Sequence, residues 1–390
     1  MQRLPRLLAV SLLSLALLPV AARAADPAPD LPSAPDDAFY TTGVPDGAAP
    51  GALIRVEELF APGDFRLWAI LYRSTGPDGA PTAVSGLVLA PSEPAAGPRP
   101  VIAVNHGTTG LGDACSPSRV TAQRLELAVA GQALARQGWV VVATDYAGLG
   151  TPGMHAYLDG PSAGHAVLDA IRAAQALPDA AAGDAVVLAG ISQGGHATLW
   201  AARMAAEAAP ELNVLGAIAA APAGDLAEVA RWVFSPDAGR PSWRNDLLIA
   251  RAWSEIYDFP IEEVLTPEAL PLAARLDEEC GVYPDAFPLR PGVAELPALA
   301  DALERNTPLG IPIAAPILYL QGDADEQIPV VAARTTVERL CADGSVVDYR
   351  ELPGVDHVGA LYDAARIDAA IAWAAARFAG EPAADTCPGR

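Results

Sequence analysis

Short apolar runs bounded by turn-forming residues alternate along most of the chain with stretches that have the periodicity of amphipathic helices. The most continuously hydrophobic runs, at 101–104, 140–144, 186–189 and 215–219, are typical of strands buried on both faces of a parallel sheet. Further strands are predicted at 67–72, 84–90, 317–320 and 346–352, and helices at 120–137, 163–176, 195–208, 330–341 and 358–378. This alternation predicts a doubly wound α/β fold, with a mostly parallel central sheet flanked by helices.

The segment 225–310 interrupts this alternation. It is rich in proline and aromatic residues, and we predict a mostly helical cap over the carboxyl edge of the sheet, where open α/β sheets place their active sites. Residues 51–224 and 311–390 then form the α/β core. The aromatic rings of the cap either line a pocket for an acyl chain or form the cap's own core; they belong to Trp232, Phe234, Trp243, Trp253, Tyr257, Phe259, Tyr283 and Phe287.

The first 24 residues have the pattern of a signal peptide. Arg3 and Arg6 precede an apolar run at 7–18, and Ala22-Arg23-Ala24 supplies a small-x-small cleavage site. The run is shorter than the roughly 20 residues of a membrane span, although a retained N-terminal anchor is the alternative. We therefore expect a secreted or periplasmic protein, in which residues 25–50 form an extended N-terminal arm.

The charge of the chain excludes some classes of binding partner. The chain has no lysine, and its formal net charge is −22 at pH 7. Such an acidic surface repels nucleic acids and anionic lipid headgroups, so we expect no nucleic-acid partner and instead a neutral small-molecule or lipid substrate. Beyond the leader, no apolar run is long enough to span a membrane.

Four cysteines follow the leader, at Cys115, Cys280, Cys341 and Cys387. In an oxidising compartment an even number predicts two disulfides, with three pairings open. No two of them are close enough in sequence for a zinc site.

The sequence Gly190-Ile191-Ser192-Gln193-Gly194 follows a buried strand and precedes a helix. This is the context of a nucleophile elbow in an α/β-hydrolase fold, where the serine lies on a strained turn between strand and helix. Small residues are needed two positions before and after the serine so that strand and helix can approach each other. The motif predicts Ser192 as the nucleophile, with the N–H of Gln193 directed at the oxyanion.

A serine nucleophile needs a base, and in this fold the order along the chain is serine, acid, histidine. Of the five histidines only His357 lies well downstream of Ser192, directly after a predicted strand. His196 lies on the helix that follows Ser192 and is expected to support the elbow, while His155 and His165 precede the nucleophile. His357 is therefore the predicted base.

The predicted acid is Asp325, in the loop that follows the strand at 317–320 and 32 residues before His357. Asp323 and Asp356 are the alternatives, and Asp323 is expected to stabilise the turn. The acids at 323, 325 and 326 are also considered as calcium ligands, but they lack the ligand spacing of a calcium loop.

A second oxyanion donor is expected in the loop after the strand at 101–104, which reads Asn105-His106-Gly107-Thr108-Thr109. We predict that it is the N–H of Thr108 and that His106 shapes the loop.

Several blocks of the sequence resemble the secretory lipase family typified by Candida antarctica lipase A. The blocks are 190–201, 209–217, 106–110, 115–118, 143–150, 325–329 and 356–357. The resemblance implies a carboxylic ester hydrolase with a helical lid, and the triad Ser192, Asp325 and His357. It also implies the disulfides Cys115–Cys280 and Cys341–Cys387. Some members of the family use an acidic side chain in the oxyanion hole, and Asp113 is the acid near that loop.

The predicted reaction is acyl transfer through Ser192 to water, which requires neither a cofactor nor a metal. A peptidase or amidase, or an acyltransferase, would use the same residues. A non-catalytic binding protein of this fold is the remaining alternative, although such proteins usually lack a member of the triad.

Overall fold

The computed structural model describes residues 34–59, 63–120, 124, 131–233, 244–280, 289–290, 292–293 and 296–389. The predicted signal peptide, the first part of the predicted arm and half of the predicted helix at 120–137 lie outside the described residues.

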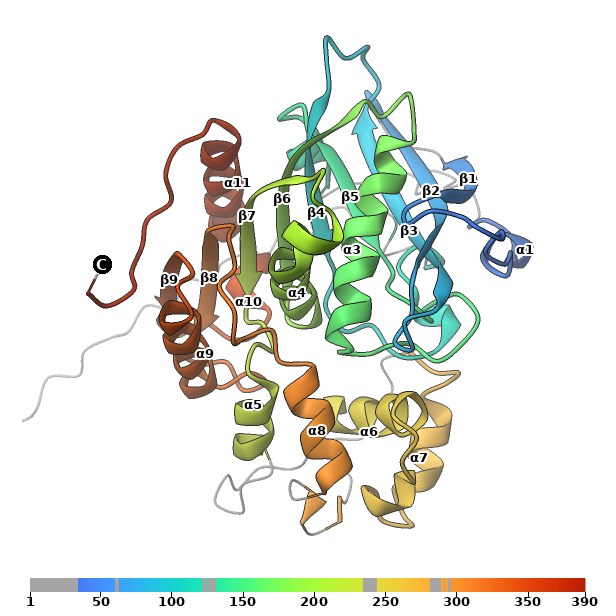
Figure 1. The fold of residues 1–390 in the computed structure, drawn as a ribbon, viewed down its shortest axis with the longest axis vertical. Helices are drawn as coiled ribbons and strands as arrows, with labels where there is room; N and C mark the ends of the chain where they lie inside the picture. Colours follow the sequence, from blue (N-terminus) through green and yellow to red (C-terminus); the bar gives the residue numbers. More distant parts are fainter. Residues whose placement is uncertain are drawn as a thin grey trace, which may run out of the picture. The chain divides into compact units, whose positions relative to one another are not determined.

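A nine-stranded mixed sheet forms the centre of the fold, with the strand order β1-β2-β3-β5-β4-β6-β7-β8-β9 (Figure 1). The first three strands pair antiparallel, β3 is antiparallel to β5, and the remaining pairs are parallel. The strands are β1 (Leu53–Leu59), β2 (Phe65–Thr75), β3 (Pro81–Pro91), β4 (Arg99–Asn105), β5 (Val140–Thr144), β6 (Ala182–Ile191), β7 (Asn213–Ala220), β8 (Ile317–Gly322) and β9 (Val347–Leu352). This mostly parallel sheet confirms the predicted fold class.

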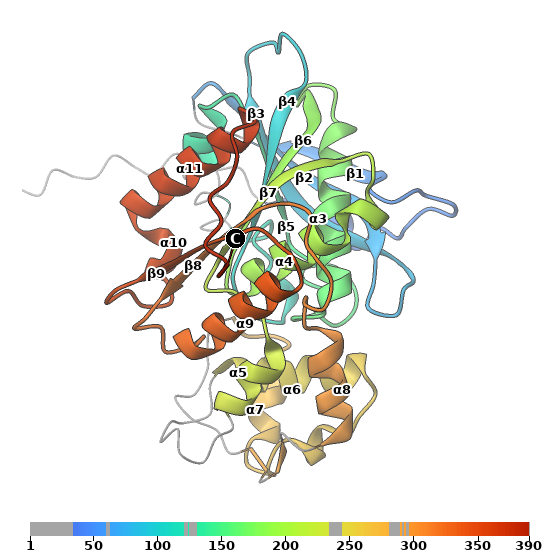
Figure 2. The same cartoon turned by 60° about the vertical axis from the view of Figure 1, so that its left-hand side comes forward.

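Helices cover both faces of the sheet (Figures 1 and 2). On one face α3 (Gly160–Gln175), α4 (Gln193–Ala208) and α9 (Val330–Ala342) pack into one apolar cluster with the strands. On the other face α11 (Ala364–Phe378) packs with Trp139 and the opposite sides of the same strands. The central strands are therefore buried on both sides, as their continuous apolar sequences predict.

The predicted helix at 358–378 is two helices. A short α10 (Gly359–Tyr362) ends at Asp363, which has extended backbone angles (φ −91°, ψ 139°). The Asp363 carboxylate accepts the N–H of Ala365 and so caps the start of α11. Aspartate favours this N-cap conformation, which breaks a pattern that is helical on both sides of it.

The described part of the predicted arm is packed against the core. Residues 37–40 form α1 (Asp37–Tyr40), in which Phe39 and Tyr40 are buried. The guanidinium of Arg119 lies 3.8 Å from the centre of the Tyr40 ring. Residues 34–40 are thus part of the fold and not a free extension.

Between β7 and β8 the described chain forms helices α5 (Leu226–Val233), α6 (Arg244–Ile256), α7 (Leu270–Arg275) and α8 (Pro297–Arg305) and the single turn η3 (Ile261–Glu263). They share an apolar cluster, to which Leu111, Tyr157 and Leu158 also belong. Within it Trp253 is fully buried and Phe259 nearly so. For these two rings, the interpretation as the core of the cap is the better one. Both figures place these helices beyond the carboxyl ends of the parallel strands.

Both disulfides that the resemblance implies are present. Cys115 is bonded to Cys280, which joins the segment after β4 to the cap, and Cys341 is bonded to Cys387, which attaches the C-terminal tail to α9. Among the described residues, no helix is both long and apolar enough to cross a bilayer.

Because the chain has no lysine, arginine supplies the cation of its side-chain ion pairs. Arg172, for example, lies 2.8 Å from Asp169 and 2.6 Å from Glu211. Further pairs join Arg66 to Glu58 and Arg334 to Glu351.

Candidate active site

Ser192 occupies the turn between β6 and α4. Its backbone has φ 58° and ψ −119°, a positive φ that non-glycine residues rarely adopt. The Ser192 N–H donates to the carbonyl of Ala220, and the Ser192 carbonyl accepts the N–H of His196 at the start of the helix. This strained turn is the geometry that an elbow motif requires.

Gly190 and Gly194 allow strand and helix to meet. A Cβ on Gly190 would lie 2.3 Å from the carbonyl oxygen of Gly194, and one on Gly194 would lie 1.9 Å from the carbonyl oxygen of Asn105. Neither position has space for a side chain, so both glycines are needed for the close contact of β4, β6 and α4.

Asp325 and His357 form a buried pair. Nδ1 of His357 lies 2.8 Å from Oδ2 of Asp325, and their side chains are 9% and 0% exposed. The same carboxylate accepts the N–H groups of Gln327 (2.7 Å) and Ile328 (2.9 Å) and the side-chain amide of Gln321 (3.0 Å). Four donors therefore surround one carboxylate, which accepts from all of them, so Nδ1 is the ring nitrogen of His357 that carries a hydrogen toward it.

The two alternative acids have other partners. Asp323 is exposed and accepts the N–H of Gly354 at 2.6 Å, which joins the loops that follow β8 and β9. Asp356 is also exposed and accepts the N–H of Gly359 at 2.8 Å. Among the described residues, no group of three or more His, Cys, Asp or Glu side chains is arranged to hold a metal, and this includes the acids considered as calcium ligands.

Ser192, Asp325 and His357 follow β6, β8 and β9, at the carboxyl edge of one sheet. Ser192 is half-buried. The hydrogen bonds within the described part of the chain include none between the Ser192 hydroxyl and His357. In unliganded sites such bonds are often long and shorten only when substrate binds.

The other histidines considered as bases are placed differently. His196 is fully buried, and its Nε2–H donates to the carbonyl of Asn306 at 2.7 Å. Burial lowers its pKa to about 4, so it stays neutral. His165 lies on α3 and is partly buried, which lowers its pKa. Neither is paired with a carboxylate as His357 is.

The loop after β4 lies against the nucleophile. A Cβ on Gly107 would be 3.8 Å from Cβ of Ser192. The Thr108 hydroxyl lies 2.8 Å from the Tyr157 hydroxyl, and the Tyr146 hydroxyl donates to the carbonyl of His106 at 3.0 Å. Asp113 is exposed in the single turn η1 (Asp113–Cys115).

Sequence reasoning did not identify Gln321, Tyr146 or Tyr157. A polar residue directly after the apolar run of β8 is a signal for Gln321. Tyr146 has φ 70°, and no sequence pattern indicates a tyrosine in that conformation. The bond of Tyr157 to Thr108 joins residues 49 positions apart and has no local signal.

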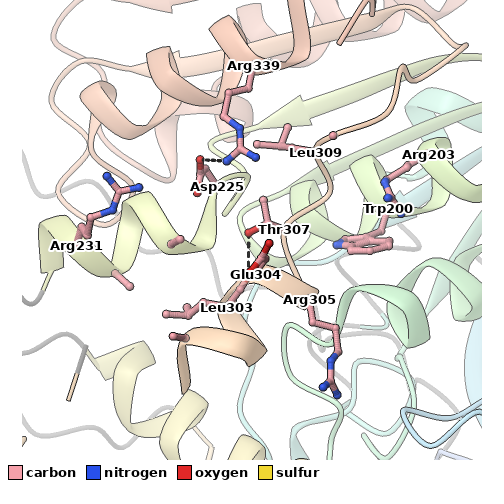
Figure 3. Close-up of a pocket in the computed structure, with 14 residues that line it drawn as sticks. Trp200, Arg203, Asp225, Arg231, Leu303, Glu304, Arg305, Thr307, Leu309 and Arg339 are labelled. Carbon is pink, nitrogen blue, oxygen red and sulfur yellow. Dashed lines mark hydrogen bonds and ion pairs between the residues drawn. The ribbon is translucent and has the colours of Figure 1, made fainter. Parts of the chain in front are cut away.

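A cavity of about 730 Å³ lies away from these residues, between α4, α5, α8 and α9 (Figure 3). Arg203, Arg231, Arg305 and Arg339 lie on different sides of it, and Arg339 is bonded to Asp225. Its polar groups do not converge on one point, and it contains no member of the predicted triad. We do not assign the chemistry to this cavity.

The chain is similar to known lipases. A model of the secretory lipase family matches residues 116–238 and 298–386, just over half of the chain. Lipase A of Moesziomyces aphidis is 33% identical over 204 residues, covering 48% of this chain and 43% of that protein, so less than half of that relative's length is spanned. A probable inactive lipase of Mycobacterium tuberculosis is 29% identical over 395 residues, covering 92% of this chain and 84% of that protein.

Candida antarctica lipase A in its closed state has a similar structure, with a TM-score of 0.73 and 22% identity over 90% of this chain and 87% of that one. At this identity the likeness concerns the fold, and with the strand order it confirms the predicted α/β-hydrolase fold. The family match and the similarity to lipase A of Moesziomyces aphidis support a carboxylic ester hydrolase.

Proposed function

Because this chain belongs to the secretory lipase family, we propose that it is a secreted carboxylic ester hydrolase in which Ser192, Asp325 and His357 form the catalytic triad. The observation that supports this most strongly is the buried hydrogen bond between His357 and Asp325, at the sheet edge that also ends in Ser192. An exposed or unpaired histidine would give no such support.

Asp325 orients the base in this proposal. Its carboxylate faces only donors, so Nδ1 of His357 keeps its proton and Nε2 keeps its lone pair. Nε2 is then the atom that accepts the proton of the Ser192 hydroxyl, and the carboxylate stabilises the imidazolium that results.

The reaction proceeds in two steps. Ser192 Oγ attacks the ester carbonyl, the N–H groups of Gln193 and Thr108 bind the oxyanion, and the alcohol leaves with the proton from His357. Water then attacks the acyl-enzyme, with His357 again as the base, and the carboxylic acid is released. Each oxyanion donor stabilises the transition state by roughly 3 kcal/mol.

One relative is described as a probable inactive lipase, and the activity of this chain is therefore the first measurement. We would measure hydrolysis of p-nitrophenyl esters of increasing acyl length and of an emulsified triglyceride, with a p-nitroanilide as the amide control. Ser192→Ala and His357→Ala are each expected to lower kcat by at least about 10⁴-fold with an unchanged Tm. Ester hydrolysis retained by purified Ser192→Ala protein would refute the assignment, and faster anilide cleavage would indicate an amidase.

Labelling gives a second readout that does not depend on the natural substrate. A serine-directed phosphonate is expected to add its mass to the peptide that contains Ser192, and to leave Ser192→Ala unlabelled. Secretion is tested by expressing the full chain and sequencing the N-terminus of the exported protein, which is expected to begin at Ala25.

A further inference from the structure

His155 lies behind the proposed oxyanion site and is fully buried. We propose that His155 is a positioning residue for ester hydrolysis: it fixes the side chain of Gln193 and so directs the Gln193 N–H toward the oxyanion. This inference rests on the proposed function, because it concerns the transition state of the same reaction.

The hydrogen bonds of His155 determine which ring nitrogen carries the proton. Nδ1 lies 3.2 Å from the carbonyl oxygen of Ala147, which can only accept, so Nδ1 is the donor. Nε2 lies 3.0 Å from Nε2 of Gln193. A neutral imidazole has one N–H, so its Nε2 is an acceptor here and the amide N–H of Gln193 donates to it.

Burial keeps this arrangement in one protonation state. It lowers the pKa of His155 to about 3, and the hydrogen bond to Ala147 opposes the decrease only in part. If His155 were an imidazolium, its Nε2–H would face the side-chain N–H of Gln193, and the hydrogen bond between these two residues would be lost. His155 therefore remains an acceptor for Gln193 at pH values well above 3.

Gln193 is the residue through which this bond reaches the site. It is the first residue of α4, where the backbone N–H has no partner within the helix and is available to a ligand. Gln193 as a whole is 4% exposed. A hydrogen bond at the end of this buried side chain limits rotation at Gln193, and with it the direction of the adjoining N–H.

The same imidazole also supports the second oxyanion segment. The ring centroids of Tyr146 and Tyr157 lie 6.2 Å and 5.9 Å from that of His155. The Tyr146 hydroxyl bonds the carbonyl of His106, and the Tyr157 hydroxyl bonds the Thr108 side chain. One residue therefore contacts the groups that hold both proposed oxyanion donors.

Two substitutions of His155 distinguish the effects of its two hydrogen bonds. His155→Asn places an amide N–H where Nδ1 was and keeps the bond to Ala147, but it leaves Gln193 without its acceptor. His155→Gln places an oxygen where Nε2 was and restores that acceptor. The Ala147 carbonyl also accepts the N–H of Ala156 at 2.9 Å, so it stays bonded in both variants.

We expect His155→Asn to lower kcat by roughly 10- to 100-fold with KM changed by less than about 3-fold, because the lost alignment acts on the transition state. His155→Gln is expected to recover kcat to within about 3-fold of the parent. Gln193→Met removes the amide from the other side of the bond. It is expected to lower kcat as much as His155→Asn, with no further loss in the double variant.

A general structural effect would not change the inhibition constant of an alkylboronic acid, so this constant is the second readout. Such an acid forms a tetrahedral adduct on the serine. The inhibition constant is expected to rise in His155→Asn by the same factor as kcat/KM falls, when both are normalised to titrated active sites. Partial unfolding would reduce the number of active sites and leave this constant unchanged.

His165→Asn is the control, because His165 lies on α3, is partly buried, and makes no hydrogen bond to Gln193 or Thr108 among the described residues. It is expected to retain kcat. A similar loss in His165→Asn, or no recovery in His155→Gln, would overturn the inference. If Ser192→Ala itself retained activity, the proposed function would fail first; loss of activity in Ser192→Ala with a fully active His155→Asn would reject only the role of His155.

Discussion

Nδ1 of His357 lies 2.8 Å from Oδ2 of Asp325, although 32 residues separate them in the chain. Asp323, two residues before Asp325, instead bonds the N–H of Gly354. Neighbouring carboxylates at the end of β8 thus differ in their surroundings: one is buried beside an imidazole and the other is exposed in a turn.

This difference predicts that replacing aspartate by asparagine lowers kcat at Asp325 but not at Asp323. In Asp325→Asn the amide oxygen still accepts from Gln327 and Ile328, so the amide N–H₂ faces His357 and forces the wrong tautomer. We expect kcat to fall by roughly 10³- to 10⁴-fold. Asp323→Asn keeps an acceptor for Gly354 and is expected to retain parental kcat. Ester kinetics on both proteins check this, and the reverse order of effects would identify Asp323 as the acid.

The close contact at Gly194 predicts a large effect on stability. A methyl group there would lie 1.9 Å from the Asn105 carbonyl oxygen, so Gly194→Ala must separate α4 from β4. We expect the free energy of unfolding to fall by about 3 kcal/mol or more. Gly97→Ala, where a Cβ meets nothing within 4 Å, is the control and is expected to change it by less than about 0.5 kcal/mol. Denaturant unfolding measures both, and equal stabilities would contradict the contact.

The Cys115–Cys280 disulfide predicts a stability difference between the two bridges. It closes a loop with a sequence separation of 165, compared with 46 for Cys341–Cys387. In the chain-entropy model, loss of the longer loop costs about 5 kcal/mol and loss of the shorter one about 4 kcal/mol. Cys115→Ala/Cys280→Ala is therefore expected to unfold at a lower denaturant concentration than Cys341→Ala/Cys387→Ala. If Cys341→Ala/Cys387→Ala unfolded at the lower denaturant concentration, the bridge to the C-terminal tail would stabilise the protein by more than its loop length implies.

The buried histidine His196 predicts how stability depends on pH. Burial lowers its pKa from 6.5 to about 4, so below pH 6.5 the unfolded chain binds a proton that the folded chain does not. The contribution of neutral, buried His196 to the free energy of unfolding is fully present above pH 6.5. It is lost as the pH falls toward 4, with about 2 kcal/mol lost between pH 6.5 and 5. Denaturant unfolding at pH 7.5, 6 and 5 measures this for the parent and for His196→Gln. The prediction fails if the variant has the same pH dependence as the parent.

The segments of the proposed triad could be predicted because their signals are local. The elbow at Ser192 is one short motif in a strand–helix context, and the order of residues along the chain leaves one downstream histidine. The choice of Asp325 over Asp323 stays a prediction, which the hydrogen bond to His357 supports. The pairing of the cysteines came only from the resemblance, because sequence spacing does not determine which distant thiols meet.

Elements whose signals are weak or non-local were missed. β1 was not predicted because Arg55, Glu57 and Glu58 give an edge strand a polar sequence, with most of its residues exposed. The break at Asp363 lies inside a pattern that is helical on both sides. The contacts of His155 with Tyr146, Tyr157 and Gln193 depend on several segments converging in space, which no local pattern indicates.

The exclusive use of arginine in the ion pairs has a consequence for alkaline solutions. A lysine-based pair loses its positive charge as the pH passes about 10.4, whereas the guanidinium stays charged beyond pH 12. All four cysteines are in disulfides, and burial raises the pKa of Tyr40 to about 12. The pairs of Arg172 and Arg334 are therefore expected to keep both charges at a pH at which lysine ammonium groups have lost theirs.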